Sequence, residues 1–302
     1  MYDFGLKKED EQRSLDLHEK SIIINGLSTF YGVNEITNIN PVRVSRYYEL
    51  MSKGRITGVN FTIAMDHSFS EACRNISLVV NSLEHAASGK MIQVRSGEEI
   101  KEAKRTDRCG LMFGFQNTLP VEFNLAFLKT FHTLGVRIVQ LTYQKRNLVG
   151  DGCGEKKDAG LSEFGVKVLG ELNRLGILVD LSHCGYKTTM EAIELSRSPV
   201  AFTHANAKAL NDCIRCKSDE QIHALAEKGG VMGITVLSKF LRPNGGITGT
   251  TLEDFLDHVG YVIDLVGVDH VGLGFDVFEL RSKEDFKENH EGRFYLKYPE
   301  MR

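Results

Sequence analysis

The chain has 302 residues, 42% of them hydrophobic, and a formal net charge of −3, which is ordinary composition for a globular protein with a large core. A sequence pI near 6.4 without a basic stripe argues against nucleic-acid binding, and no apolar run is long enough to predict a membrane span. Residues 1–20 are polar and lack the apolar stretch of a signal peptide, so we expect a cytoplasmic protein with a leading helical segment over 1–20.

Eight short apolar runs predict buried strands. Their residues are 21–25, 58–64, 110–115, 136–143, 177–182, 199–204, 230–237 and 270–276. Because the runs are apolar on both faces rather than alternating, they are typical of parallel strands covered by helices.

Helical patterns separate these runs, and three of them have clear ends. Residues 162–176 start at Ser162 and stop at Gly176, whereas 218–230 and 251–267 open on Ser or Thr followed by acidic residues. Repeated alternation of strand and helix predicts a single (β/α)8 barrel domain over 1–302. A doubly wound open sheet is the alternative, but no G-x-G-x-x-G follows the first strand.

The charged segment 278–302 lacks a final apolar helix, so we expect an incomplete C-terminal extension or a chain truncated after the eighth strand.

Six cysteines are too few for a disulfide framework in a chain of this length. Cys213 and Cys216 form a single CxxC, and no second CxxC exists to complete a zinc cage. We therefore predict a structural or incidental role for this pair.

Polar side chains gather where the predicted strands end, which is where barrel enzymes place their chemistry. Strands five and six end on His183 and His204, and neighbouring strands lie about 4.8 Å apart, so two imidazoles could share one metal ion. The other polar residues at the same mouth are Gln116, Asn117, Tyr143, Asn147, Arg215 and Asp276. A carboxylate such as Asp276 could act as a general base, and Arg215 could clamp a substrate carboxylate.

At these residues the sequence resembles the membrane (renal) dipeptidase family of metallopeptidases, from about residue 18 to about 280. The densest match is "GLSEFGVKVLGELNRLGILVDLSHCG" at 160–185, and "VGLGFD" is similar to a second family motif. The resemblance implies a (β/α)8 barrel that hydrolyses dipeptides at a two-zinc site, in a family whose members often form homodimers. It implies that His183 and His204 bind the second metal, that Arg215 holds the substrate carboxylate and that Asp276 transfers protons.

Three departures from the family pattern remove expected ligands. Leu27 and Thr29 stand where the family has the histidine and aspartate of the first metal, and Gln116 replaces the glutamate that bridges both metals. Tyr143 stands where the family has a histidine that stabilises the tetrahedral intermediate. We therefore expect zinc or another divalent transition metal, one ion at most, with a metal-free site as the alternative. A remodelled His/Cys site using Cys184 or Cys153 is a further alternative.

The predicted function is a dipeptidase-like hydrolase acting on a dipeptide or related small amide. The predicted residues are Asp276 and Tyr143 for catalysis, Arg215, Asn147 and Gln116 for substrate binding, and His183 and His204 for metal. The alternatives are a lyase, an isomerase or another amide or lactone hydrolase on the same barrel, and an inactive small-molecule binder.

Overall fold

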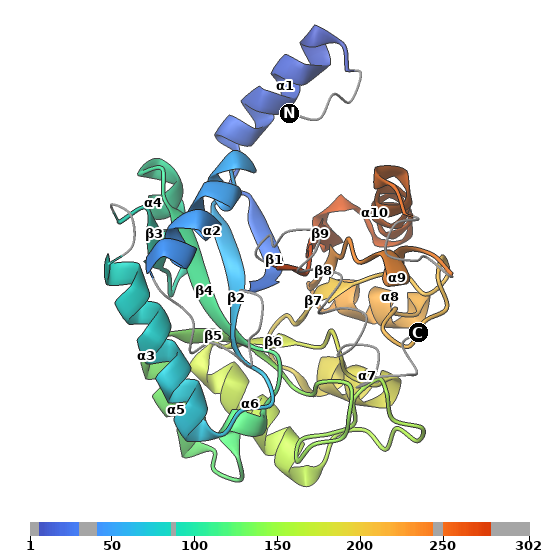
Figure 1. Ribbon diagram of the computed structural model, residues 1–302. Coiled ribbons are helices and arrows are strands. Elements are labelled where there is room, and N and C mark those ends of the chain that lie inside the picture. Colours follow the sequence, from blue (N-terminus) through green and yellow to red (C-terminus); the bar gives the residue numbers. More distant parts are fainter. Residues whose placement is uncertain (1–5, 30–40, 86–88, 244–249, 279–302) are drawn as a thin grey trace, which may run out of the picture.

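Eight parallel strands close into a barrel with helices on its outside (Figure 1). The computed structural model describes residues 6–29, 41–85, 89–243 and 250–278. The strands around the barrel are β1 (Ile24–Thr29), β2 (Gly58–Ala64), β4 (Cys109–Phe115), β5 (Val136–Gln140), β6 (Leu178–Asp180), β7 (Ala201–Ala205), β8 (Val231–Ile234) and β9 (Val271–Leu273). Asn25 of β1 pairs with Leu273 of β9, which closes the ring and confirms the predicted (β/α)8 fold.

Helices follow most strands and cover the barrel, except for α1, which precedes the first strand. They are α1 (Lys8–Lys20), α2 (Pro41–Lys53), α3 (Phe69–His85), α4 (Gly97–Arg105), α5 (Ala126–Thr133), α6 (Glu163–Leu175), α7 (Tyr186–Leu195), α8 (Asp219–Glu227), α9 (Ser238–Leu241) and α10 (Leu252–Val266). The predicted ends hold: Ser162 caps α6 through Gly165 N, and Gly176 ends it with φ +67°. Ser218 and Thr251 form capping boxes on α8 and α10.

The first strand is the clearest boundary error of the sequence reading. Strand β1 spans 24–29 rather than 21–25, and the apolar Ile22 and Ile24 are exposed, whereas the polar Asn25 is buried. The Asn25 side chain accepts hydrogen bonds from the backbone N–H groups of Leu27 and Phe275, which offsets the cost of burying it. The apolar run at 21–25 therefore lies mostly before the strand, and the strand itself has a more polar sequence.

Two short strands lie outside the prediction. Strand β3 (Met91–Gln93) pairs with β4, and β10 (Val277–Phe278) pairs with β1. Runs of three and two residues are too short to stand out as apolar segments. The predicted extension 278–302 lies outside the described residues from 279 onward.

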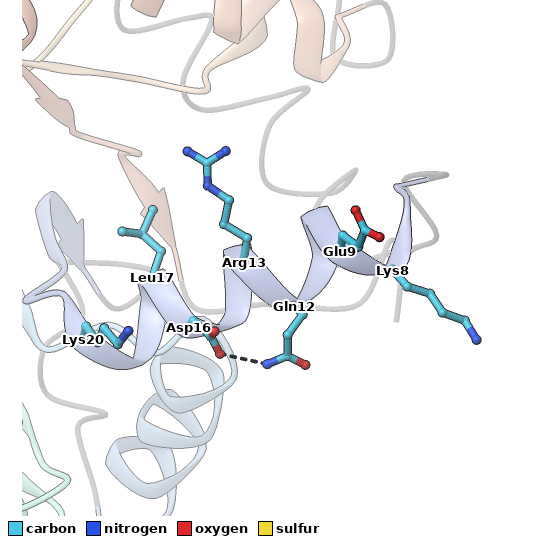
Figure 2. Close-up of a pocket in the computed structure, with 7 residues that line it drawn as sticks. All are labelled: Lys8, Glu9, Gln12, Arg13, Asp16, Leu17 and Lys20. Atoms are coloured by element: carbon cyan, nitrogen blue, oxygen red, sulfur yellow. Dashed lines mark hydrogen bonds between the residues drawn. The ribbon is translucent and has the colours of Figure 1, made fainter.

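Helix α1 projects away from the barrel (Figure 1). It contacts the body through Lys104 Nζ, which donates to His18 O at 3.1 Å, and through an ion pair of Arg55 with Glu19. Arg55 precedes β2, so these contacts lie toward the amino ends of the strands, opposite the end where polar residues gather. A hollow of about 690 Å³ runs along α1, and its lining residues within the described ranges all belong to that helix (Figure 2). No helix in the described part of the chain has the length and apolarity needed to span a membrane.

The carbonyl oxygen of Thr203 in β7 lies close to three positions without side chains, Gly26 of β1, Gly233 of β8 and Gly274 after β9. A Cβ built on Gly233 would lie 2.3 Å from Thr203 O, and one built on Gly274 would lie 2.1 Å from it. Glycine is required at both positions because any side chain would overlap this backbone oxygen. The two glycines therefore leave room for this carbonyl oxygen. They help to set the backbone position of β7 at Thr203, and with it the position of the next residue, His204.

Candidate active site

The structure brings His183 and His204 together at the carboxyl ends of two neighbouring strands. His183 follows β6 by a short turn, His204 lies within β7, and their Nε2 atoms are 2.9 Å apart. Both imidazoles are buried. The two imidazoles thus lie side by side, as the ends of neighbouring strands predicted. They form a hydrogen-bonded pair at the barrel mouth.

A chain of hydrogen bonds connects this histidine pair to Asp180. The Thr203 hydroxyl donates to Asp180 Oδ2 at 2.7 Å and lies 2.8 Å from His204 Nδ1. Since the hydroxyl proton is directed to Asp180, we assign the ring proton of His204 to Nδ1. His204 Nε2 then accepts from His183 Nε2–H, which leaves the buried His183 Nδ1 as an acceptor without a partner in the part of the chain that the structure describes.

Burial is the main reason why both histidines are neutral. Desolvation lowers the pKa of His183 and of His204 well below the ordinary value, and the nearby cations Arg215 and Lys217 lower both further. The pair therefore carries no charge at neutral pH and can serve as hydrogen-bonding groups or as ligands.

Arg215 lies beneath the same mouth and is 1% exposed. Its guanidinium donates to Ser182 O through Nη1 and to His204 O at 3.0 Å through Nη2, while its Nε has no hydrogen-bond partner among the described residues. A buried N–H without an acceptor is costly, so this atom marks a place where an anionic ligand would be favoured.

Two further cations make the mouth electropositive. Lys217 donates to Leu181 O at 2.8 Å and to Cys184 O at 3.2 Å, and burial lowers its pKa to about 8. Burial also lowers the pKa of Lys239 to about 8, and this lysine lies near enough to Asp276 for the carboxylate to oppose that shift. Sequence reasoning missed both lysines. Lys217 comes two residues after Arg215, and Lys239 follows β8, the seventh barrel strand, closely, so reading every strand end for cations would have found them.

Asp276 and Tyr143 also face this region. Burial raises the pKa of Asp276 to about 6, although Arg215 and Lys239 act in the opposite direction. Asp276 adopts φ +55°, and its backbone N–H donates to Leu27 O, which ties it to β1. The Tyr143 ring stacks on the His183 imidazole.

The remaining predicted site residues are held by the protein itself. The Gln116 amide donates to Thr62 Oγ1 at 2.8 Å. Asn147 Nδ2 donates to Asn117, Thr118 and Leu141, and its Oδ1 accepts from two backbone N–H groups of its own loop. Asn147 thus anchors the loop after β5, and substrate binding by its amide would require one of these bonds to break.

The donor set does not fit a two-zinc centre. Leu27 is buried at the position expected for a first-metal histidine, and among the described residues no group of three His, Cys, Asp or Glu side chains could hold an ion. His183 Nδ1 also lacks the carbonyl or carboxylate partner that usually orients a metal-binding imidazole. Three neighbouring cations would oppose a divalent ion further. At most, the two Nε2 atoms offer one ion a partial site.

The cysteine alternative gains little support from the geometry. The Cys153 thiol donates to Gln144 Oε1 at 2.8 Å, and Cys184 Sγ accepts from the Thr142 hydroxyl. Burial raises the pKa of Cys184 to about 11, so its thiol stays protonated.

Comparison with known proteins gives a consistent result. Residues 12–287 match the family model described as membrane dipeptidase, peptidase family M19. Among curated proteins, dipeptidase verJ of Clonostachys rogersoniana is 27% identical over 245 residues, covering 76% of this chain and 62% of that protein. Dipeptidase tcpJ of Claviceps purpurea is 30% identical over 220 residues, covering 72% of this chain and 51% of that protein. The chain thus spans about half of the length of the curated relatives it matches.

Solved structures show the same barrel. An amidohydrolase from Pseudomonas aeruginosa superposes with a TM-score of 0.79 at 34% identity, covering 90% of this chain and 79% of that one. A metallopeptidase from Rhodobacter sphaeroides, bound to a phosphinate mimic of the dipeptide L-Ala-D-Ala, superposes with a TM-score of 0.76 at 22% identity, covering 93% and 95%. The second likeness concerns the fold alone.

Proposed function

The chain belongs to the membrane dipeptidase family, peptidase family M19, and on that premise we propose that it is a dipeptidase-like hydrolase of a dipeptide or related small amide with a free carboxylate. The observation that carries the proposal is the unpartnered Nε of Arg215, buried beside the histidine pair in an electropositive mouth. A substrate carboxylate would satisfy this N–H and balance the positive charge of Arg215 and Lys239.

Asp276 is the proposed general base. As the oxygen of a water molecule attacks the amide carbon, the Asp276 carboxylate takes a proton from that water and later delivers it to the leaving amine nitrogen. A pKa of about 6 leaves the carboxylate mostly ionised at pH 7 while keeping it a better base than an ordinary aspartate. Tyr143 is the proposed hydrogen-bond donor to the tetrahedral intermediate, in the place where the family resemblance puts a histidine.

Family membership implies a metal, but the donor set does not fit a two-zinc centre, so the proposed steps use the chain's own residues alone. If a single zinc or other divalent ion binds, His183 and His204 are its proposed ligands. Gln116 lies at the position expected for the bridging carboxylate, and its neutral amide cannot supply the negative charge of a glutamate.

The same loss of ligands favours a second candidate function, a barrel that binds a carboxylated small molecule without hydrolysing it. This candidate rests on Leu27 and Gln116, because both occupy expected ligand positions and neither can act as an anionic ligand.

A turnover and binding experiment separates the two candidates. A panel of dipeptides is incubated with the chain in the presence of zinc, manganese, cobalt or EDTA, and products are measured by mass spectrometry. A hydrolase gives turnover that falls at least 100-fold in Asp276→Asn. Calorimetric binding without turnover supports the binder, and an Arg215→Gln variant should lose that binding while Arg242→Gln, at an exposed arginine, should retain it. Neither turnover nor binding would contradict both candidates.

A cytoplasmic location is also proposed, because all six cysteines are unpaired, as expected of a protein kept in a reducing compartment. Cell fractionation tests this location. Homodimer formation, proposed from the family resemblance, is tested by sedimentation of the purified chain.

A further inference from the structure

The loop of residues 206–217 leaves β7 and returns to the point where it started. Lys217 N donates to Asn206 O at 2.8 Å, and Lys208 N donates to Lys217 O at 2.8 Å, so the two ends of the loop are joined. The loop carries Arg215, whose guanidinium contacts the main chain at Ser182 and His204. A chemical change within this closed loop would therefore act next to the proposed ligand site.

Two thiols meet inside this loop. Cys213 Sγ and Cys216 Sγ are 2.9 Å apart, and a turn in which Cys216 N donates to Cys213 O at 3.0 Å holds them there. A disulfide requires about 2.05 Å, so only a small approach of the sulfur atoms separates the pair from a bond. Cys216 is buried and Cys213 is half-buried, which leaves Cys213 as the thiol that a reagent can reach.

We propose that Cys213 and Cys216 are a redox-active dithiol, which a low-molecular-weight disulfide such as oxidised glutathione converts into an intramolecular disulfide. The Cys213 thiolate attacks one sulfur of the reagent, forms a mixed disulfide and releases one glutathione thiolate. The Cys216 thiolate then attacks the Cys213 sulfur and releases the second glutathione. The protein dithiol loses two electrons and two protons, and the reagent gains them as two thiols.

The electrostatics of the pair agree with this order of attack. A hydrogen bond from Cys216 lowers the pKa of Cys213 to about 7, with a smaller contribution from the positive charge of Arg215. The same interaction, together with burial, raises the pKa of Cys216. The accessible thiol is thus also the one that is partly ionised at neutral pH, as a nucleophilic thiol must be.

Oxidation would also act on Arg215, because this residue lies within the ring that the disulfide closes. The guanidinium carbon of Arg215 lies 5.4 Å from the centre of the Phe240 ring, and Cys216 Sγ contacts Phe240 O at 3.7 Å. Moving Cys216 toward Cys213 therefore changes contacts that hold Arg215 against β6 and β7.

The test uses the full chain, reduced, freed of metal with EDTA, and equilibrated at pH 7.5 over a series of ratios of oxidised to reduced glutathione. Remaining thiols are alkylated after acid quenching, and peptides are identified by mass spectrometry. We expect the Cys213–Cys216 disulfide to form at ratios where Cys109 and Cys184 are still fully alkylated. A Cys216→Ser variant should retain glutathione on Cys213, whereas a Cys73→Ser variant should behave as the wild type. The proposal is overturned if both thiols stay reduced over the whole series, or if all six cysteines oxidise together.

Hydrogen exchange tests the link to Arg215 without relying on any activity. Peptides covering 201–217 should exchange at least several-fold differently in the oxidised and reduced chains, while peptides from α3 should not change. Equal exchange in 201–217 would contradict the coupling to Arg215 even if the disulfide forms.

Discussion

Tyr143 covers one face of His183, with ring centroids 4.2 Å apart and ring planes inclined by 27°. His204 meets the edge of the same imidazole through Nε2. The aromatic cover and the neighbouring ring exclude water from His183, which explains why the protonated form is so unfavourable there.

This burial makes stability depend on pH. The unfolded chain takes up protons at both histidines near pH 6.5, whereas the native pKa values are lower, so the native state loses stability as pH falls through 6.5. In EDTA-treated protein, we expect urea unfolding to show a loss of about 1.5 kcal/mol from this pair between pH 7.5 and 6.0. Asp276 has a raised pKa of about 6 and opposes this trend, to a small extent between pH 7.5 and 6.0 and mainly below pH 6.

The matched variants are His204→Asn and His223→Gln. The first should remove about half of the pair's pH-dependent loss, and the second, at an exposed histidine, should leave the loss unchanged. An identical pH dependence in His204→Asn and wild type would show that the pair is not held neutral.

Gly233→Ala should destabilise the barrel by about 1–3 kcal/mol, because the new methyl would overlap Thr203 O and β7 would have to shift. Thermal and urea unfolding measure the change. Gly170→Ala is the matched control: that glycine lies inside α6 with open space around it, and alanine there should stabilise the helix by about 0.5–1 kcal/mol. A neutral Gly233→Ala would mean that the strands adjust freely at this point.

Asn147→Ala should destabilise the chain by roughly 2–3 kcal/mol and speed hydrogen exchange in the loop after β5, because it removes donors and acceptors that the loop uses. Asn124→Ala is the control, since the exposed Asn124 side chain accepts one bond, from Ala126 N, and its loss should cost under about 1 kcal/mol. If Asn147→Ala kept full stability and lost only ligand binding, the predicted substrate-binding role would be favoured over the anchoring role.

Restoring two expected ligands should create zinc affinity. In Leu27→His combined with Gln116→Glu, we expect zinc to bind at least tenfold more tightly than in the wild type, since an imidazole and a carboxylate join the histidine pair. Elemental analysis and competition with a chelator measure this, and circular dichroism checks folding. Gln221→Glu makes the same charge change in the α8 capping box and should leave zinc binding unaltered. Equal affinity in the double variant would mean that these positions do not face the pair.

Sequence reasoning predicted the barrel because parallel strands buried on both faces give continuous apolar runs, and it predicted helix ends because caps are local. It placed His183 and His204 together because strand ends converge. It misplaced β1, whose exposed isoleucines and buried Asn25 reverse the usual pattern. It missed Lys217 and Lys239 because only some of the strand ends were read for cations. The positions of these lysines are visible in the sequence, but their burial is not, since it results from packing between segments far apart in the chain.

The backbone around Thr203 limits how a site of this kind can change. Ligand chemistry at the mouth can be altered by replacing one side chain at a time, as Leu27 and Gln116 illustrate in the places where the family resemblance implies ligands. The location of His204 is a different matter, because it depends on Gly233 and Gly274 leaving room for a carbonyl oxygen. Substitutions of side chains at the mouth can therefore change which ligand binds. The position of the binding site depends on the packing of the backbone inside the barrel, and single substitutions at the mouth do not alter it.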